Sequence, residues 1–300
     1  MATELEAVQS AALLFPDYDA LRIGLVQPLY ESERAVQDYF EQAAHITTLN
    51  VTRLLFHGSE TELRSLPEAY ILLFLVQASI VEYLRTKNIV PTQVGGIGLG
   101  IYGALFAVQA YTFPDGLYML SKWAAAYNDF LHEKNIKKIQ LTNITEKEMH
   151  KSLKKYDEVV ASEKIAETIF KLVGPRSAVE AYEEELAKKY SDVVVQEVPT
   201  ESGLYADIAP EAAAHYKQYL EKVEFADAQV PCFSPCQAED LVSAQQIKDF
   251  MAHQPFAHQD QVQLLDRYED VDTLIVPFAD DALYERILAR FPKKNIIKTV

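Results

Sequence analysis

The chain has 300 residues, of which 49% are hydrophobic and 24% are charged, and its net charge is −16 at pH 7. This length suits one large domain, or a large domain that carries a smaller insertion, and the composition excludes a disordered chain. The strong negative charge argues against nucleic acid and against an anionic membrane surface as partners, because both would be repelled.

Two other features of the composition bear on metal binding and location. Cys232 and Cys236 lack the partners of a disulfide framework or a zinc site, so we expect neither a metal nor a cofactor. The first ten residues contain no basic region followed by an apolar run, so no signal peptide is predicted. The most apolar segment, residues 69–84, is shorter than the roughly 20 residues of a membrane span and contains Gln77 and Glu82. We expect a buried helix there, and a soluble, cytoplasmic protein without membrane contact.

The first 133 residues predict a short sheet surrounded by helices. Residues 11–16 read as a buried strand that Pro16 ends, and a mostly helical stretch follows. A long apolar helix extends to about residue 85, a short strand precedes residues 95–96, and a helix rich in small residues begins near residue 101. After a predicted break at 112–116, residues 117–134 form a helix with apolar residues every three or four positions.

The character of the sequence changes near residue 137. A strand is predicted at 137–143 and a helix at 145–156. Two strands joined by a turn follow within 159–174, and then come a helix at 175–190 and a strand at 192–198. This β-α-β-β-α-β order indicates a ferredoxin-like subdomain at residues 134–198, inserted into a larger α/β domain formed by residues 1–133 and 199–300. In the last part we predict helices at 210–223, 247–254, 259–268 and 280–291, and strands at 230–235 and 272–278.

The stretch GGIGLGIYGALFA, residues 95–107, allows two interpretations. Gly98, Gly100 and Gly103 have the spacing of a dinucleotide-binding loop. That reading also needs a strong strand before the first glycine and a second strand ending in an acidic residue, and neither is apparent. A nucleophile elbow, in which a tight turn joins a strand to a helix of small residues, fits the context better. In that frame Gly98 stands at the position of the nucleophile.

Several segments, in order along nearly the whole chain, carry a family resemblance. They are LFPDYDAL, the stretch from LPEAYILL through the glycines to LSKW, the inserted subdomain, and VPTESGLYAD. In these the chain resembles the malonyl-CoA:acyl carrier protein transacylases and the acyltransferase domains of polyketide synthases. The resemblance implies the acyltransferase fold, an α/β hydrolase-like core with a short parallel sheet plus an inserted ferredoxin-like βαββαβ subdomain.

The resemblance also implies which positions would form the active site, and this chain departs from the family at each of them. The family uses a serine nucleophile, a histidine base, backbone N–H groups that stabilise the oxyanion, and an arginine that pairs with the malonyl carboxylate. The corresponding positions are Gly98 for the serine, Ile97 before it, Glu201 for the histidine, Tyr18 between Asp17 and Asp19 for the oxyanion loop, and Trp123 for the arginine. Loss of the family's transfer chemistry is therefore expected.

Other residues could replace the missing groups. Ser202, beside Glu201, is the one nearby hydroxyl next to a possible base, although such a pair is common in loops. His253 and His258 fall near the family's substrate tunnel, but surface or core histidines are the simpler interpretation. Trp123 could either line the former acyl pocket or fill it as core packing, and Tyr18 could close the same cavity.

The sequence leaves three hypotheses for function. The first is a catalytically inactive homologue that acts as a binding, scaffold or regulatory subunit in fatty acid or polyketide biosynthesis, with an acyl carrier protein or synthase subunit as partner. We predict that the basic face for that partner is formed by the lysines at the start of the insert, namely Lys137, Lys138, Lys151, Lys154 and Lys155. The second is an active transacylase or thioester hydrolase in which Glu201 with Asp17 or Asp19 activates water. The third is a sensor that holds a CoA ester, which would stabilise the folded state.

Overall fold

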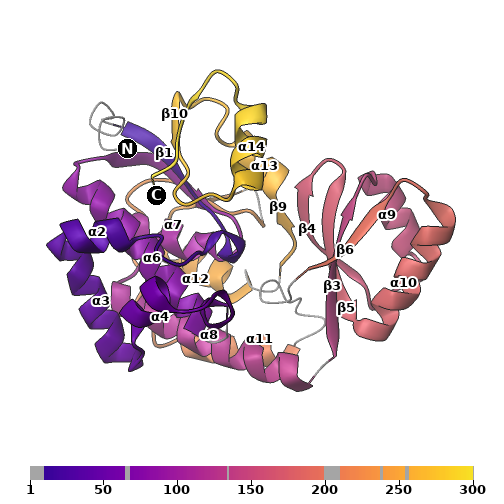
Figure 1. The fold of residues 1–300 in the computed structure, drawn as a ribbon, viewed down its shortest axis with the longest axis horizontal. Helices are drawn as coiled ribbons and strands as arrows, with labels where there is room; N and C mark the ends of the chain where they lie inside the picture. Colours follow the sequence, from indigo (N-terminus) through magenta and orange to yellow (C-terminus); the bar gives the residue numbers. More distant parts are fainter. Residues whose placement is uncertain are drawn as a thin grey trace.

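The computed structural model describes residues 10–64, 68–133, 135–198, 210–236, 239–253 and 257–299. The chain forms a large α/β unit and a smaller unit that lie side by side (Figure 1). The order of elements places the smaller unit in the middle of the sequence, so the chain leaves the large unit and returns to it.

A six-stranded sheet of order β11-β10-β1-β2-β7-β8 forms the centre of the large unit, and its neighbouring strands are parallel except for β7 and β8. Its strands are β1 Ser10–Phe15, β2 Val90–Gly96, β7 Cys232–Phe233, β8 Asp240–Leu241, β10 Thr273–Ile275 and β11 Asn295–Ile297. Ala11, Leu13 and Phe15 of β1 face one hydrophobic cluster, and Ala12 and Leu14 face another on the opposite side. The unbroken apolar run in β1 follows from this burial on both faces.

Helices cover both faces of this sheet. They are η1 Tyr18–Ala20, α2 Gln27–Ser32, α3 Arg34–Thr47, α4 Val51–His57, α5 Glu60–Leu63, α6 Glu68–Thr86, α7 Gly100–Ala107, α8 Phe113–Glu133, α11 Pro210–Leu220, α12 Ala244–His253, α13 Gln261–Asp266 and α14 Asp281–Arg290. The predicted break at 112–116 is wrong, since α8 begins at Phe113. Pro114 lies in its first turn, where proline is tolerated, and the Thr112 hydroxyl accepts a hydrogen bond from the Asp115 N–H at 3.4 Å.

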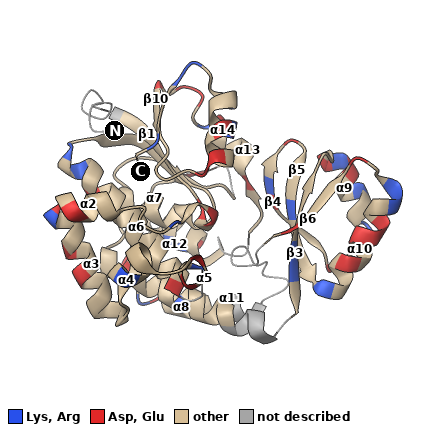
Figure 2. Cartoon of the chain, viewed as in Figure 1, with Lys and Arg blue, Asp and Glu red and all other residues tan. Residues whose placement is uncertain are grey.

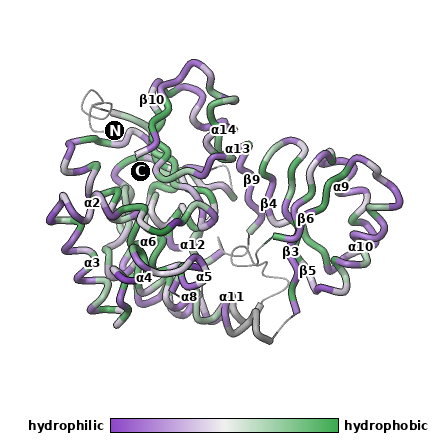
Figure 3. The backbone as a smooth tube through the Cα atoms, viewed as in Figure 1, coloured by the Kyte–Doolittle hydropathy of each residue, from purple (hydrophilic) through white to green (hydrophobic). Residues whose placement is uncertain are grey.

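The long apolar helix α6 crosses the interior of the large unit, as expected from its sequence. Its length and composition would suit a membrane span, but 83% of its most apolar window is buried inside the protein. Figure 3 shows it within the hydrophobic interior of the large unit. The side-chain amide of Gln77, a buried polar group in this helix, donates to the Leu99 carbonyl at 3.3 Å. Gln77 thus ties α6 to the turn that precedes α7.

The smaller unit has the predicted β-α-β-β-α-β order. Its elements are β3 Ile136–Thr142, α9 Glu146–Leu153, β4 Val160–Ala166, β5 Ile169–Pro175, α10 Arg176–Lys189 and β6 Val194–Val198. The four strands pair antiparallel in the order β6-β3-β5-β4, which is the ferredoxin-like arrangement. Ile139 and Leu141 of β3 pack with Met149 of α9 and Tyr182 of α10. The helices therefore cover the sheet face turned away from the large unit (Figure 1).

A fifth strand, β9 Gln259–Asp260, joins this sheet from the later part of the chain and pairs parallel with β4. The sequence analysis did not predict β8, β9 or β11, which are two or three residues long. Pairing with distant strands creates such short elements, so no local pattern indicates them. Through β9, strand pairing joins the later part of the chain to the sheet of the smaller unit.

Candidate functional site

The turn from β2 to α7 brings Gly98 to the edge of the sheet, between the two units. Gly98 has φ +55°, in the left-handed region that favours glycine, and its N–H donates to Gln259 Oε1 at 2.9 Å. At Gly100, a Cβ would lie 2.3 Å from the Phe15 carbonyl oxygen, so α7 lies close against β1. The glycine spacing thus serves a strand–turn–helix packed on its neighbours, as the elbow interpretation predicts.

The side chain of Asp17 fills the space over Gly98. Its Oδ1 accepts hydrogen bonds from the N–H groups of Tyr18 and Leu99, each at 2.8 Å. A Cβ on Gly98 would lie 2.1 Å from both Cγ and Oδ2 of Asp17, closer than atoms approach one another. The turn and the loop after β1 therefore fit together only while residue 98 has no side chain.

Asp17 also lies in an environment that disfavours its charge. Burial raises the pKa of this carboxyl to about 6, and the nearby acids Asp19 and Glu163 add to the effect, while Lys171 and the Tyr18 N–H oppose it. Above this pH the carboxylate is ionised, so a negative charge is held by two backbone N–H groups at the tip of the elbow.

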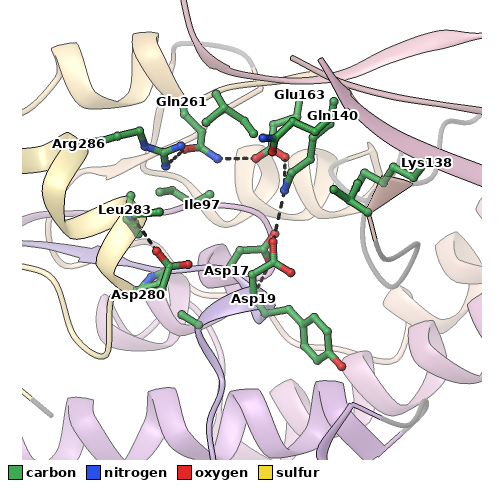
Figure 4. Close-up of a pocket in the computed structure, with 17 residues that line it drawn as sticks. Asp17, Asp19, Ile97, Lys138, Gln140, Glu163, Gln261, Asp280, Leu283 and Arg286 are labelled. Carbon is green, nitrogen blue, oxygen red and sulfur yellow. Dashed lines mark hydrogen bonds and ion pairs between the residues drawn. The ribbon is translucent and has the colours of Figure 1, made fainter. Parts of the chain in front are cut away.

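Beside this turn is a cavity of about 250 Å³ between the large unit and the inner face of the small sheet (Figure 4). Its walls come from the loop after β1, strands β3 to β6, and helices α13 and α14. It is lined by Pro16, Asp17, Tyr18, Asp19, Ala20, Ile97, Lys138, Gln140, Glu163, Ile165, Lys171, Val198, Gln261, Asp280, Ala282, Leu283 and Arg286. Most of these side chains are polar or charged, so the cavity suits a polar ligand better than an acyl chain.

A chain of polar contacts crosses this cavity from one unit to the other. Lys171 Nζ lies 3.0 Å from Glu163 Oε2 and 3.4 Å from Asp19 Oδ2. Gln261 donates to Glu163 Oε1 at 2.5 Å, and Arg286 donates to Gln261 Oε1 at 2.8 Å. The dashed lines in Figure 4 follow these contacts. They bind strands β4 and β5 of the small unit to the loop after β1 and to helices α13 and α14.

The charges in this chain stabilise one another in spite of their burial. Burial by itself would raise the pKa of Glu163, but Lys171, Lys138 and the Gln261 hydrogen bond outweigh it and hold the pKa at about 2. For Lys171, burial would lower the pKa, and Glu163 and Asp19 raise it above its usual value instead. Glu163 and Lys171 are therefore a buried ion pair that remains charged at neutral pH.

The network residues Glu163, Lys171, Gln261 and Arg286 were missed in the sequence analysis. A signal was present for two of them, since Glu163 and Lys171 are charges within strands that are otherwise largely apolar. Charged residues at inward-facing strand positions indicate a partner across an interface. Gln261 and Arg286 lie on helices whose relation to the small sheet no sequence pattern reveals.

The structure brings some of the predicted site residues together and separates others. Ile97 and Tyr18 line the cavity, and both are buried. Trp123 does not line it. Glu201 and Ser202 lie outside the described residues, so their predicted roles have no structural counterpart here.

Trp123 belongs to an aromatic cluster in the core between α6, α7, α8 and α11. It is 2% exposed, its ring stacks on Tyr127 at 5.5 Å between centroids, and it lies 5.3 Å from the ring of Tyr216. The hydroxyls of Tyr216 and Tyr102 are 2.6 Å apart, and Tyr70 stacks on Tyr127 at 6.3 Å. Trp123 thus packs as a core residue, one of the two roles considered for it.

The predicted basic face needs correction, because Lys137 and Lys138 are buried at 8% and 3% exposure. Successive side chains of a strand point to opposite faces of the sheet. Lys137 lies 2.5 Å from Glu183 of α10 on the outer face, whereas Lys138 lines the cavity on the inner face. Neither residue can contribute to an exposed docking surface.

The other three lysines, Lys151, Lys154 and Lys155, are exposed at the end of α9 and just after it. Figure 2 shows basic residues on α9 beside the acidic helix α10. His253 and His258 are exposed as well, as the simpler interpretation predicts. His258 Nδ1 lies 3.0 Å from the Ala161 carbonyl oxygen, and neither histidine lines the cavity beside Gly98. Among the described residues, no group of three His, Cys, Asp or Glu side chains could hold a metal ion.

Comparison with solved structures identifies the architecture. An acyl carrier protein S-malonyltransferase from Vibrio cholerae matches with a TM-score of 0.88 at 15% identity, over 97% of this chain and 96% of that one. The chain has the acyltransferase fold. The malonyl-CoA:acyl carrier protein transacylase of Helicobacter pylori matches with a TM-score of 0.86 at 17% identity, over 97% and 94% of the two chains. A type II polyketide synthase malonyl-transacylase, solved in complex with its acyl carrier protein, matches with a TM-score of 0.87 at 16% identity, over 96% and 95%.

Sequence comparison agrees with the acyltransferase fold. The malonyl-CoA:acyl carrier protein transacylase of Bacillus subtilis is 23% identical over 82% of this chain and 78% of its own length. No protein-family model matches the chain. The sequence matches support the malonyl-CoA:acyl carrier protein transacylase and polyketide synthase acyltransferase family, and the predicted fold class is confirmed.

Because the pKa of Asp17 is raised in the folded state, we expect the free energy of unfolding to depend on pH. The folded pKa is about 6 and the ordinary value is 3.8, so the folded state binds more protons than the unfolded state between these values. The free energy of unfolding should therefore fall by about 2–3 kcal/mol as the pH rises from about 4 to 6. Asp17→Asn keeps an oxygen acceptor without the charge, and should flatten this slope and raise stability at pH 7.5. Urea denaturation across this pH range measures both effects.

The matched control for this prediction is Asp19→Asn, two residues away. The charge of Asp19 raises the pKa of Asp17 less than burial does, so Asp19→Asn should reduce the slope between pH 4 and 6 only in part. An unchanged slope in Asp17→Asn would contradict the assignment to Asp17.

Proposed function

We propose that this chain is a catalytically inactive acyltransferase homologue that acts as a binding, scaffold or regulatory subunit in a fatty acid or polyketide biosynthesis system. The observation that carries the proposal is the position of Asp17 over Gly98. Acyl transfer by a serine needs a hydroxyl at the elbow and two N–H groups directed at the developing oxyanion. Here residue 98 has no side chain, and the Asp17 carboxylate accepts hydrogen bonds from the Tyr18 and Leu99 N–H groups.

The aromatic cluster around Trp123 supports the same conclusion. The family resemblance puts the arginine that pairs with the malonyl carboxylate at this position. A buried indole packed against Tyr127 and Tyr216 offers no bidentate donor to a carboxylate. The residues that match the family's nucleophile, oxyanion loop and substrate-binding arginine thus all favour loss of transfer chemistry.

Intact-mass spectrometry tests the proposal directly. The purified chain would be incubated with malonyl-, acetyl- and longer acyl-CoAs, with and without a holo acyl carrier protein, and the B. subtilis transacylase would serve as positive control. We expect no acyl adduct on the chain and no acyl transfer to the carrier above the uncatalysed rate. An adduct, or faster transfer, would show that another nucleophile acts, and mapping would begin at Ser202.

The partner that we propose is an acyl carrier protein or a synthase subunit. Carrier proteins are acidic in this family, and the polyketide transacylase with this fold was solved with its carrier bound. This chain is acidic overall, so docking needs a local basic surface. Lys151, Lys154 and Lys155 are the exposed part of the predicted set.

Charge reversal at these three lysines tests that surface. Replacing Lys151, Lys154 and Lys155 by glutamate should weaken carrier binding at least about tenfold, and more at low salt than at high salt. Surface plasmon resonance with immobilised holo carrier gives the affinity. The matched control is Lys188→Glu on α10, another exposed lysine of the same unit. Equal affinity in the triple variant and the control would eliminate this surface.

One observation favours a second candidate function, a thioester hydrolase. A carboxyl whose pKa is about 6 and which lines a cavity has the properties of a general base for water. If this activity exists, release of free CoA from acyl-CoA should rise with pH around 6 and should fall at least about a hundredfold in Asp17→Asn. CoA release at the uncatalysed rate by the unmodified chain would end this alternative.

A further inference from the structure

Arg286 lines the cavity and forms no ion pair with the residues that the structure describes. Its guanidinium makes one hydrogen bond among the described residues, from an Nη to Gln261 Oε1, and Nε has no partner. Glu163 and Asp280 act on it electrostatically without forming an ion pair with it. Asp280, the acid nearest in sequence on the cavity wall, caps α14 instead by accepting from the Leu283 N–H at 2.7 Å. The other N–H donors of this partly buried guanidinium are therefore available to bind the carboxylate of a ligand.

Asp17 presents a complementary group on the part of the cavity wall formed by the loop after β1. Its Oδ1 takes both hydrogen bonds from the elbow and the loop, whereas its Oδ2 makes none with the described residues. Asp17 lines the same cavity as Arg286, as the close-up in Figure 4 shows. The cavity thus offers donors for a carboxylate on one side and an acceptor with negative charge on the other.

The volume and charges of the cavity limit the ligand further. A volume of about 250 Å³ is small for a whole CoA ester and suits a small molecule. Four carboxylates and three cationic side chains line the cavity, so a ligand that carries both charges matches its walls better than a simple anion. An ammonium group on the ligand would pair with the negative charge of Asp17.

We propose that this cavity binds a small amino acid, with its carboxylate on Arg286 and its ammonium group on Asp17 Oδ2. The inference rests on the proposed function, because it treats the former catalytic cleft as a binding site. It differs from the family's substrate recognition in the residue used, since Arg286 belongs to α14 and the family's arginine position, Trp123, belongs to α8. A pool of free amino acid could then regulate the interaction of this subunit with its partner.

Isothermal titration calorimetry of the full chain tests the proposal. The probes are the series from glycine to 6-aminohexanoate, which varies the distance between the two charges, and the matched acids from acetate to hexanoate. We expect at least one amino acid to bind, and to bind more tightly than the acid of the same length. Arg286→Gln should weaken that binding at least about tenfold. Asp17→Asn should abolish the preference for the amino acid over the matched acid.

Arg290→Gln is the control, since Arg290 lies one turn further along α14, outside the cavity, and pairs with Asp266 and Glu269. Circular dichroism would establish that each variant is folded. The proposal is overturned if no probe binds the unmodified chain, or if Arg286→Gln binds as tightly as Arg290→Gln. Acyl transfer to a carrier would be measured in the same samples. Such transfer would contradict the proposed function, whereas amino acid binding that depends on Arg286 would still support the binding site.

Discussion

Gly98→Ala is expected to lower the free energy of unfolding by about 2–5 kcal/mol. Two costs combine in this estimate: about 1–2 kcal/mol for an L-residue at φ +55°, and about 1–3 kcal/mol for overpacking. The overpacking arises because the new Cβ would lie 2.1 Å from the Asp17 carboxylate. Gly98→Ser should be destabilised similarly and should form no acyl-enzyme, because Asp17 occupies the space that the hydroxyl needs. Urea denaturation measures the stability, and mass spectrometry the adduct.

Two comparisons separate these costs. Gly24 has φ +77° but open space around it, the nearest atom to a Cβ being Gln27 Oε1 at 3.9 Å. Gly24→Ala should therefore be destabilised by the backbone strain alone, by about 1–2 kcal/mol. Adding Asp17→Ala to Gly98→Ala should recover the overpacking cost, since the clashing atoms are gone. If Gly98→Ala and Gly24→Ala were equally destabilised, the fit of Asp17 over the turn would not matter for stability.

Lys171→Met is expected to be destabilising by about 3–5 kcal/mol, the usual cost of removing one partner of a buried ion pair. The pair consists of Lys171 and Glu163, whose side chains are 11% and 8% exposed. The variant leaves the Glu163 carboxylate buried without its cation, so the pKa of this carboxyl should rise from about 2. The double variant Lys171→Met, Glu163→Gln should recover most of the loss, because the carboxylate that lost its cation is then replaced by a neutral amide.

The pH dependence of stability checks the same pair. Glu163 has a folded pKa below its ordinary value of 4.5, so its contribution to stability is present above that pH and is lost as the pH falls toward 2. In Lys171→Met this loss should become smaller, because only Lys138 and the Gln261 hydrogen bond still lower the pKa of Glu163. The control is Lys164→Met on β4, the strand of Glu163, whose partners Glu146 and Glu167 are 51% and 75% exposed. A change larger than about 1 kcal/mol in this control would contradict the distinction between buried and exposed pairs.

Local patterns in the sequence predicted most of the fold. The apolar run of β1, the long helix α6 and the order of elements in the small unit each follow from periodicity and from turn residues. The predicted helix near residues 145–156 also forms, and Thr145 and Glu148 make a capping box at its start. The Pro-Asp-Gly sequence at 114–116 predicts a break, whereas it lies in the first turn of α8, because proline is common both in turns and at the start of a helix.

The candidate site was only partly predictable. The sequence alone determined that residue 98 has no side chain, that two acids flank Tyr18, and that a tryptophan takes the arginine position. Alternation along the predicted strand places Lys137 and Lys138 on opposite faces of the sheet, so the two cannot belong to one docking surface. The tertiary structure alone decided that the Asp17 carboxylate would accept hydrogen bonds from the Tyr18 and Leu99 N–H groups, and that Arg286 would line the same cavity. These residues lie up to 269 positions apart, and side-chain chemistry at such separations depends on how the two units pack, which no local pattern encodes.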